Sequence, residues 1–391
     1  MRLTTAAIAT LVALALPSAA FAHGHGHGRD GVKRIVVIYE ENHSFDNLYG
    51  RWEGVNGLAN ADPAHTTQVN QAGTPYTCLK QNDVNLATPP LPATCHDATV
   101  TPPFDSAFPN APFEIDKYIA PSDTTCPPPG DFSKPNGYLK GTGLPGGCTR
   151  DLVHRFYQEQ YQLDGGKQDR YVTGSDAIGL TMGTYDTTAL PVYKYLHTPG
   201  HPRFAIADDF FQAAFGGSFL NHQWLVAAAT PTFPGAPADQ HSVLDANGMP
   251  TSYPLYTATG PVKDTALTAA CPAPNGLACG DYAVNTIQPT YQPHGSGLQL
   301  PPQTAPTIGD RLSARHVDWA WYSGGWSNAN GDVGAPGWTN GNGPACSDPN
   351  TATGATFPNC PDKLFQYHHQ PLNYYASFAP GTAQRKAHLR D

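Results

Sequence analysis

The chain has 391 residues, which is enough for one large domain or two domains of ordinary size. Its net charge is −9 at neutral pH and no basic run exceeds two residues, so nucleic acid is not expected as a partner. The sequence contains 39 glycines and 39 prolines. Because the proline clusters alternate with aromatic-rich segments, we expect ordered loops rather than extensive disorder.

The first 22 residues have the features of a secretory signal peptide. Arg2 supplies the positive start, an apolar stretch follows, and small residues precede His23 at the expected cleavage point. The apolar stretch is too short to span a membrane, so no transmembrane segment is predicted. We therefore expect a periplasmic or secreted protein with a signal peptide (1–22), a His/Gly-rich N-terminal segment (23–33) and one domain (34–391).

Apolar patterning predicts strands and helices that alternate between long loops. The unbroken apolar run at 34–39 is typical of a strand buried on both faces. The later elements are a helix at 151–162 with Asp151 as N-cap, a strand at 203–211, a helix at 216–230 with Ser218 as N-cap, and a helix followed by an aromatic strand within 307–325. This order indicates an α/β sheet with Pro/Gly-rich loops, and such sheets place their sites at the carboxyl ends of strands.

The eight cysteines all lie in loop segments rich in proline and glycine. An even number in an exported protein indicates disulfide bonds, and the absence of a CxxC pair argues against a zinc knuckle. Pairing between sequence neighbours closes the shortest loops, although the sequence does not fix the connectivity. The expected pairs are Cys78–Cys95, Cys126–Cys148, Cys271–Cys279 and Cys346–Cys360.

Two polar clusters follow predicted strands. Glu41 and Asn42 offer a carboxylate and an amide oxygen, which suit a hard cation, but they also fit a turn in which Asn42 and Ser44 bond local backbone groups. Ser218 follows two glycines at a helix start, where the helix dipole favours an anion. It is therefore either a nucleophile for a phosphoryl group or only a helix cap.

Several histidines are further candidates for the site. His154 lies on a mainly polar predicted helix, and His222 follows Ser218 by four residues, where a structural role is at least as well supported as a catalytic one. His368 and His369 are adjacent, so an extended chain would direct only one of them into a site.

Five blocks of sequence, in order, resemble the bacterial phosphoesterase family. They are "EENHSFDNLYG", "DLVHRFYQEQ" with "GGKQDRYV", "FAIADDFFQAAFGGSFLNHQWLVAA", "TIGDRL" with "WAWYSGGW", and "YHHQPLNYY". That family includes non-specific phospholipases C and secreted acid phosphatases within the alkaline phosphatase superfamily, and "GGSFLNH" resembles the acid phosphatase branch. The resemblance implies an α/β phosphoesterase domain with a central, mostly parallel sheet flanked by helices.

The resemblance also implies residue roles. Glu41 and Asn42 match metal-ligand positions for a divalent or trivalent ion, and Ser218 matches a serine nucleophile that also contacts the metal. His154 and one of His368 and His369 match phosphate-side histidines. The metal would polarise a phosphoryl oxygen, Ser218 would attack in line, and water would hydrolyse the phosphoserine of a small phosphate ester or phospholipid.

The chain departs from the family pattern in one respect. It has no "DExGGxxDHV"-like segment, which supplies two acidic metal ligands and a histidine in the family. We therefore expect a C-terminally incomplete phosphoesterase with little activity by itself, because hard cations take six or more oxygen ligands. The alternative is a truncated, non-catalytic secreted protein that binds a metal or an anion.

Overall fold

The structure is a computed structural model that describes residues 33–41, 43–80, 92–119, 152–175, 177–200, 203–237, 242–244, 278–291, 297–338 and 365–391. The chain divides into two units, Met1–Glu40 and Glu41–Asp391, and each is considered by itself. The predicted signal peptide lies outside the described residues, as does nearly all of the His/Gly-rich segment, so both stay predictions.

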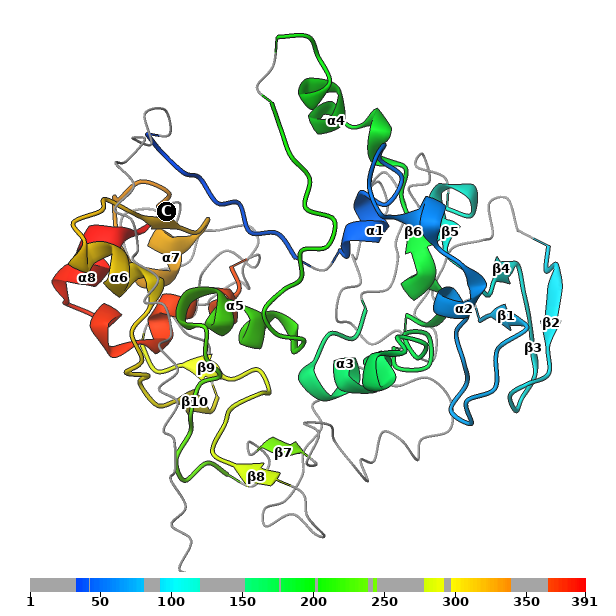
Figure 1. The fold of residues 1–391 in the computed structure, drawn as a ribbon. Helices are drawn as coiled ribbons and strands as arrows, with labels where there is room; N and C mark the ends of the chain where they lie inside the picture. The colour runs from blue at the N-terminus through cyan, green and yellow to red at the C-terminus, as the bar shows by residue number, and fades with distance from the viewer. Residues whose placement is uncertain are drawn as a thin grey trace, which may run out of the picture. The chain divides into compact units, whose positions relative to one another are not determined.

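The described part of the first unit, residues 33–40, is extended chain without a strand (Figure 1). The apolar side chains from Ile35 to Ile38 are 75–81% exposed. The prediction of a strand at 34–39 buried on both faces is therefore wrong for this structure. A strand needs a neighbour for its backbone N–H and C=O groups, and the described residues of this unit provide none.

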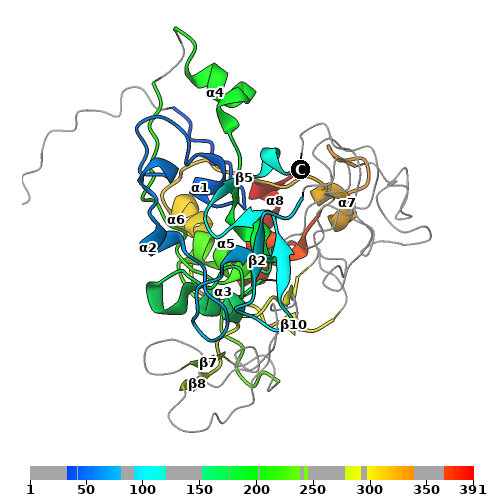
Figure 2. The same cartoon turned by 90° about the vertical axis from the view of Figure 1, so that its right-hand side faces the viewer.

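The second unit contains short helices joined by irregular chain (Figures 1 and 2). Its α-helices are α1 (Phe45–Leu48), α2 (Pro63–Thr66), α3 (Phe156–Leu163), α4 (Pro191–Leu196), α5 (Gly217–Ala227), α6 (Ile308–Ala314), α7 (Trp326–Asn330) and α8 (Ala383–His388). Short 3-10 helices include Ile178–Met182, Tyr367–His369 and Pro371–Tyr374. With 11 residues, α5 is the longest of the described helices, and it carries Ser218 and His222.

The strands of the described residues pair only two by two. Three pairs are parallel: β5 (Phe113–Glu114) with β6 (Gly183–Thr184), β9 (Gln288–Pro289) with β10 (Gln299–Leu300), and β11 (Trp321–Tyr322) with β12 (Leu389–Arg390). Three are antiparallel: β1 (Cys78–Leu79) with β4 (Phe108–Pro109), β2 (Cys95–Asp97) with β3 (Phe104–Ser106), and β7 (Ser242–Leu244) with β8 (Ala278–Gly280). The mixture of helix and strand is consistent with an α/β protein, but the expected large central sheet is not seen in the described part of the chain.

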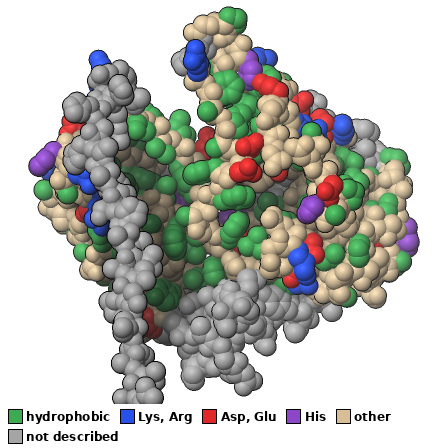
Figure 3. All heavy atoms as spheres, in the orientation of Figure 1, with side chains coloured by type: hydrophobic (Ala, Val, Ile, Leu, Met, Phe, Trp, Pro, Cys, Tyr) green, Lys and Arg blue, Asp and Glu red, His purple; other side chains and the backbone are tan. Residues whose placement is uncertain are grey.

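The strand predicted at 203–211 is also absent. These residues are irregular chain, and Phe210 and Phe211 are 77% and 70% exposed. Exposed apolar side chains are visible over the face shown in Figure 3. The segment is apolar enough for a strand, but apolar content alone does not supply the partner strand that a sheet requires.

The predicted helices are present with shifted ends. The first begins at Phe156 rather than near Asp151, which lies outside the described residues, because the chain up to the N-cap Arg155 is extended. The helix predicted at 216–230 is α5, but Gly216 is its N-cap and Ser218 is its second residue, so Ser218 is not the cap. The predicted helix and aromatic strand within 307–325 are confirmed as α6, which Thr307 caps, and β11.

Two hydrophobic clusters support the second unit. One gathers α5, α7 and the C-terminal segment around Phe219, Tyr374 and Phe378, all fully buried. The other surrounds β1, β4 and β5, with Leu79 and Phe108 at its centre. The first cluster lies beneath α5 and the 3-10 helix Tyr367–His369, so it fixes the elements that carry the histidines of the candidate site.

A disulfide bond joins Cys78 and Cys95 next to the second cluster. The buried carboxylate of Asp97 accepts hydrogen bonds from the backbone N–H groups of Thr77, Cys78 and Thr99. Burial raises the pKa of Asp97, but the hydrogen bond from the Thr99 hydroxyl, together with these backbone bonds, outweighs burial and lowers the pKa below its usual value. The first predicted disulfide is therefore confirmed, whereas the other three pairs involve side chains outside the described residues.

No helix in the part of the chain that the structure describes is both long and apolar enough to cross a membrane.

An apolar side chain in place of Gln223 should stabilise the protein. Gln223 on α5 is fully buried, and both polar atoms of its side chain lack a partner among the described residues. Because an unsatisfied buried polar group costs about 1–3 kcal/mol, Gln223→Met should raise the free energy of unfolding measured by urea titration. The control is Gln162→Met, since Gln162 Nε2 donates to the carbonyls of Val153 and Gly174 and its loss should destabilise. Equal destabilisation by both substitutions would contradict the expectation.

Candidate functional site

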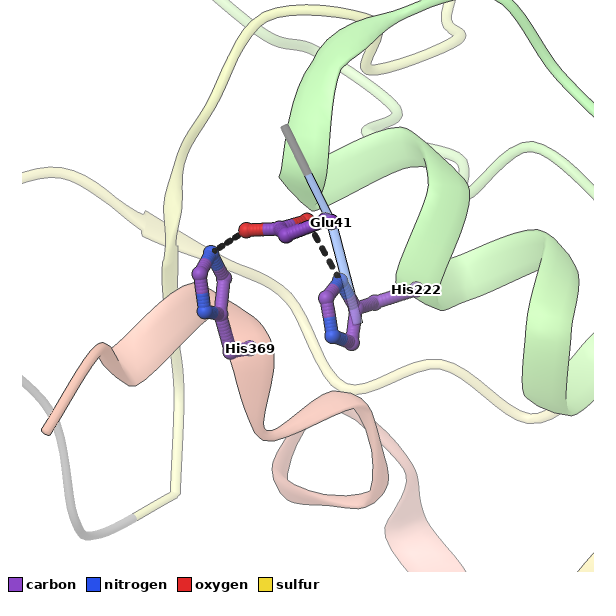
Figure 4. Close-up of side chains that lie close together, drawn as sticks. All are labelled: Glu41, His222 and His369. Carbon is purple, nitrogen blue, oxygen red and sulfur yellow. Dashed lines mark ion pairs between the residues drawn. The ribbon is translucent and has the colours of Figure 1, made fainter. Parts of the chain in front are cut away.

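The carboxylate of Glu41 is the centre of a side-chain cluster drawn from three distant parts of the chain. Ser218 Oγ donates to Glu41 Oε1 at 2.8 Å, and His369 Nε2 lies 2.7 Å from the same oxygen. His222 Nδ1 lies 3.9 Å from Glu41 Oε2 (Figure 4). The resemblance implies a metal ion that Glu41 and Ser218 both contact, and the structure places these two side chains in direct contact across a separation of 177 residues.

Helix α5 positions Ser218 and His222 on one face. Ser218 lies in the first turn, and His222 lies one turn later, with Nδ1 2.7 Å from the backbone carbonyl oxygen of Ser218. That bond requires the proton on Nδ1 of His222. The ring of His222 stacks on the ring of His369, with centroids 4.7 Å apart and planes 7° apart. The stack joins α5 to the 3-10 helix Tyr367–His369.

The cluster controls the charge of Glu41. Burial raises the pKa of Glu41, but the hydrogen bond and positive charge of His369, with the hydrogen bond from Ser218, lower it to about 2. Burial lowers the pKa of His222 below its usual value. Around neutral pH the site therefore contains a half-buried anion that accepts a hydrogen bond from the Ser218 hydroxyl.

The two adjacent histidines differ in their contacts. His369 bonds Glu41, which answers the question that the sequence left open as to which of the pair contacts the cluster. The ring of His368 meets that of His369 edge-on, with centroids 4.4 Å apart. Burial, and next the charge of His369, lower the pKa of His368 to about 3, so His368 is a neutral ring near neutral pH.

His154 lies at the border of the same region. Its Nδ1 bonds the backbone oxygen of Leu152 at 2.5 Å, and its charge influences the pKa of His368. The backbone oxygen of His154 also lies beneath Gly217, next to Ser218. The structure thus brings Glu41, Ser218 and His369 into direct contact, with His368 and His154 near them. Asn42, the second predicted metal ligand, lies outside the described residues.

His222 is the residue whose participation the sequence left undecided. Its position four residues after Ser218 on a predicted helix was the available signal, because residues four apart share a helix face. The sequence could not show that His369 would stack on this ring.

Glu41, His222 and His369 could hold a metal ion, since their ligand atoms lie within 4.8 Å of one another. Two imidazole nitrogens and a carboxylate oxygen suit zinc or ferrous iron, rather than the all-oxygen set expected for a hard cation. The donor types fit, but a ring nitrogen binds a metal in the plane of its ring. Because the two rings are stacked, one ring must turn before both can bind one ion.

Comparison with models of known protein families identifies the family to which the chain belongs. A model of the phosphoesterase family matches residues 32–391, so the chain belongs to the phosphoesterase family. Membership implies the hydrolysis of phosphoric esters and small phosphate esters as substrates. No curated protein sequence matches the chain significantly.

The turn before Ser218 should be intolerant of a larger side chain. Gly217 has φ +70°, and a Cβ there would lie 2.1 Å from the backbone oxygen of His154. We expect Gly217→Ala to lower the melting temperature clearly more than Gly235→Ala. Gly235 has the same backbone conformation, with φ +71°, but nothing within 4 Å of an added Cβ, so it reports backbone strain alone. Similar melting temperatures for the two variants would show that the contact with His154 imposes no constraint.

Proposed function

We propose that this protein hydrolyses phosphoric monoesters with Ser218 as its nucleophile, in the manner of a secreted acid phosphatase. The observation that carries the proposal is the 2.8 Å hydrogen bond from Ser218 Oγ to a carboxylate that stays ionised down to about pH 2. Ser218 also lies in the first turn of α5, where the helix dipole favours an anionic substrate. Family membership supports the reaction class.

The proposed reaction has two steps. In the first, Ser218 Oγ bonds to phosphorus while the bond from phosphorus to the ester oxygen breaks, and the alcohol leaves with a proton. In the second, water attacks the phosphoserine, and inorganic phosphate leaves as Ser218 recovers its proton. Before the attack, Glu41 accepts the hydrogen bond from the free Ser218 hydroxyl and so orients the attacking oxygen.

The histidines have distinct proposed roles. His369 holds the Glu41 carboxylate in place, and His368 and His154 border the space in which the phosphoryl oxygens would lie. If a metal ion binds, we propose Glu41, His222 and His369 as its ligands, with Asn42 and Ser218 as the further ligands that the family resemblance implies. Such an ion would polarise the phosphoryl group and lower the pKa of the serine hydroxyl.

We also propose that the protein acts outside the cytoplasm. The predicted signal peptide supports this location. The disulfide between Cys78 and Cys95 supports it independently, because disulfides persist mainly in oxidising compartments.

The nucleophile is tested by Ser218→Ala. We expect kcat for a chromogenic phosphate monoester to fall more than about 10³-fold with an unchanged circular dichroism spectrum, because no other group in the first turn of α5 replaces the hydroxyl. Ser313→Ala on α6, where the hydroxyl bonds Gln384, is the control for loss of a hydroxyl elsewhere. Undiminished turnover by Ser218→Ala would refute the proposed nucleophile. Absence of turnover in the unsubstituted protein as well would favour the non-catalytic alternative.

The metal ligands are tested by calorimetric titration with Zn²⁺ at neutral pH. We expect His222→Ala and His369→Ala each to weaken binding at one site by tenfold or more, because each removes a proposed ligand. His388→Ala is the control, since that ring stacks on Trp319 instead. The His/Gly-rich segment at 23–33 is present in every variant, so differences between variants report the cluster alone. Identical binding by all four proteins would exclude this metal site.

A further inference from the structure

We propose that Glu159 is the positioning residue of the nucleophile turn: its carboxylate anchors the backbone of Gly217 and so holds Ser218 Oγ against Glu41. The inference rests on the proposed function, because positioning has a kinetic meaning only if Ser218 is the nucleophile. Glu159 lies on α3. Its described contact is with the backbone of Gly217, and the structure describes no contact between Glu159 and the side chains of Ser218 and Glu41.

The contact is a hydrogen bond from the backbone N–H of Gly217 to Glu159 Oε1, at 2.9 Å. One residue further along α3, Gln160 Nε2 donates to the backbone oxygen of Phe215 at 3.1 Å. Two successive side chains of α3 therefore hold the chain on both sides of Gly216. From below, the backbone oxygen of His154 fits so closely under Gly217 that no Cβ can be placed there.

The bond from Gly217 to Glu159 satisfies a backbone N–H group that α5 cannot pair within the helix. The first N–H groups of a helix have no partner within the helix, and Gly217 is the first residue of α5. A carboxylate at this end satisfies the N–H and interacts favourably with the helix dipole. Since Ser218 follows directly, any rotation of the Gly217 peptide would move the Ser218 side chain away from Glu41.

The pKa of the Glu159 carboxyl group lies close to neutral pH. Burial raises its pKa to about 7, while the bonds from Gly217 and Gly216 and the charge of His154 act in the opposite direction. The phenol of Tyr171 faces the same group, and burial followed by the charge of Glu159 raises the pKa of Tyr171 to about 12. Below pH 7 the anchor is a neutral carboxyl group, which accepts hydrogen bonds more weakly than the ionised form does.

The sign of the stability effect follows from this shift. Between pH 4.5 and about 7 the folded protein keeps the Glu159 proton that the unfolded chain has lost. The folded state therefore binds more protons in this range, and the contribution of Glu159 to stability decreases as the pH rises through it. Glu159→Gln, which is neutral at every pH but retains an acceptor oxygen, should lack this decrease in melting temperature.

The experiment compares Glu159→Gln, Glu159→Asp and Glu159→Ala with the unsubstituted protein. We expect Glu159→Ala to lower kcat for a phosphate monoester about 10²-fold with KM changed less than twofold, as expected when a reacting atom is displaced but the binding surface is kept. In the unsubstituted protein kcat should rise as Glu159 ionises near pH 7, because the ionised carboxylate accepts the Gly217 hydrogen bond more strongly. Glu159→Gln should retain most of kcat and should show no such rise. Glu159→Asp, which is one methylene shorter, should give an intermediate kcat. Glu53→Ala removes an exposed carboxylate that bonds Tyr193, and it serves as the control.

A second readout does not depend on turnover. Hydrogen–deuterium exchange of the peptide that contains Gly217 should be faster in Glu159→Ala than in the unsubstituted protein, and close to normal in Glu159→Gln. If Glu159→Ala does not fold, the Asp and Gln variants decide the question by the same two measurements. A Gln variant as impaired as the Ala variant, or an effect on KM alone, would overturn the positioning role. If the unsubstituted protein has no activity, the proposed function fails, and normal exchange in Glu159→Ala would then overturn the anchor separately.

Discussion

The carboxylate of Glu41 is the constraint on which the candidate site depends. It accepts a hydrogen bond from Ser218, pairs with His369 and lies close to His222, so two distant segments of the chain converge on one group. An isolated buried carboxylate would be unfavourable, and it is the histidine and serine contacts that keep it ionised. The stacked imidazoles and the first turn of α5 surround this anion. The hydrophobic cluster beneath them packs against both α5 and the 3-10 helix Tyr367–His369 and so fixes their positions.

Much of the site could be predicted from the sequence, because its chemistry is local to short motifs. Glu41 follows an apolar run and Ser218 follows two glycines, and these local patterns are enough to indicate both residues as site candidates. The choice between His368 and His369 could not be predicted, since it depends on a ring stack with a residue more than 140 positions away, and this separation is far beyond any local periodicity. The anchoring of Gly217 by Glu159 was not visible either, because a glutamate on a polar helix is most often solvated.

The fold was predicted less well than the site. Helices α5 and α6 were located because caps, glycines and apolar spacing are encoded within a few residues. The segments at 34–39 and 203–211 are apolar enough for strands, yet pairing depends on a neighbour elsewhere in the chain, and no such neighbour is described. The Cys78–Cys95 bond was predictable because it closes a short loop, with a separation of 17 residues.

Glu41 itself belongs to no helix or strand, and it lies between extended chain and the single turn of α1. Its backbone therefore lacks the ladder of hydrogen bonds that restrains a residue in regular structure, and the loss of conformational entropy on ordering it must be offset by its side-chain partners. The order of this segment is consequently cooperative with the site: an event that withdraws Ser218 or His369 also releases the main chain around residue 41. Local opening at this point should be easier than unfolding of the cores, which makes the segment a natural origin for sub-global fluctuations.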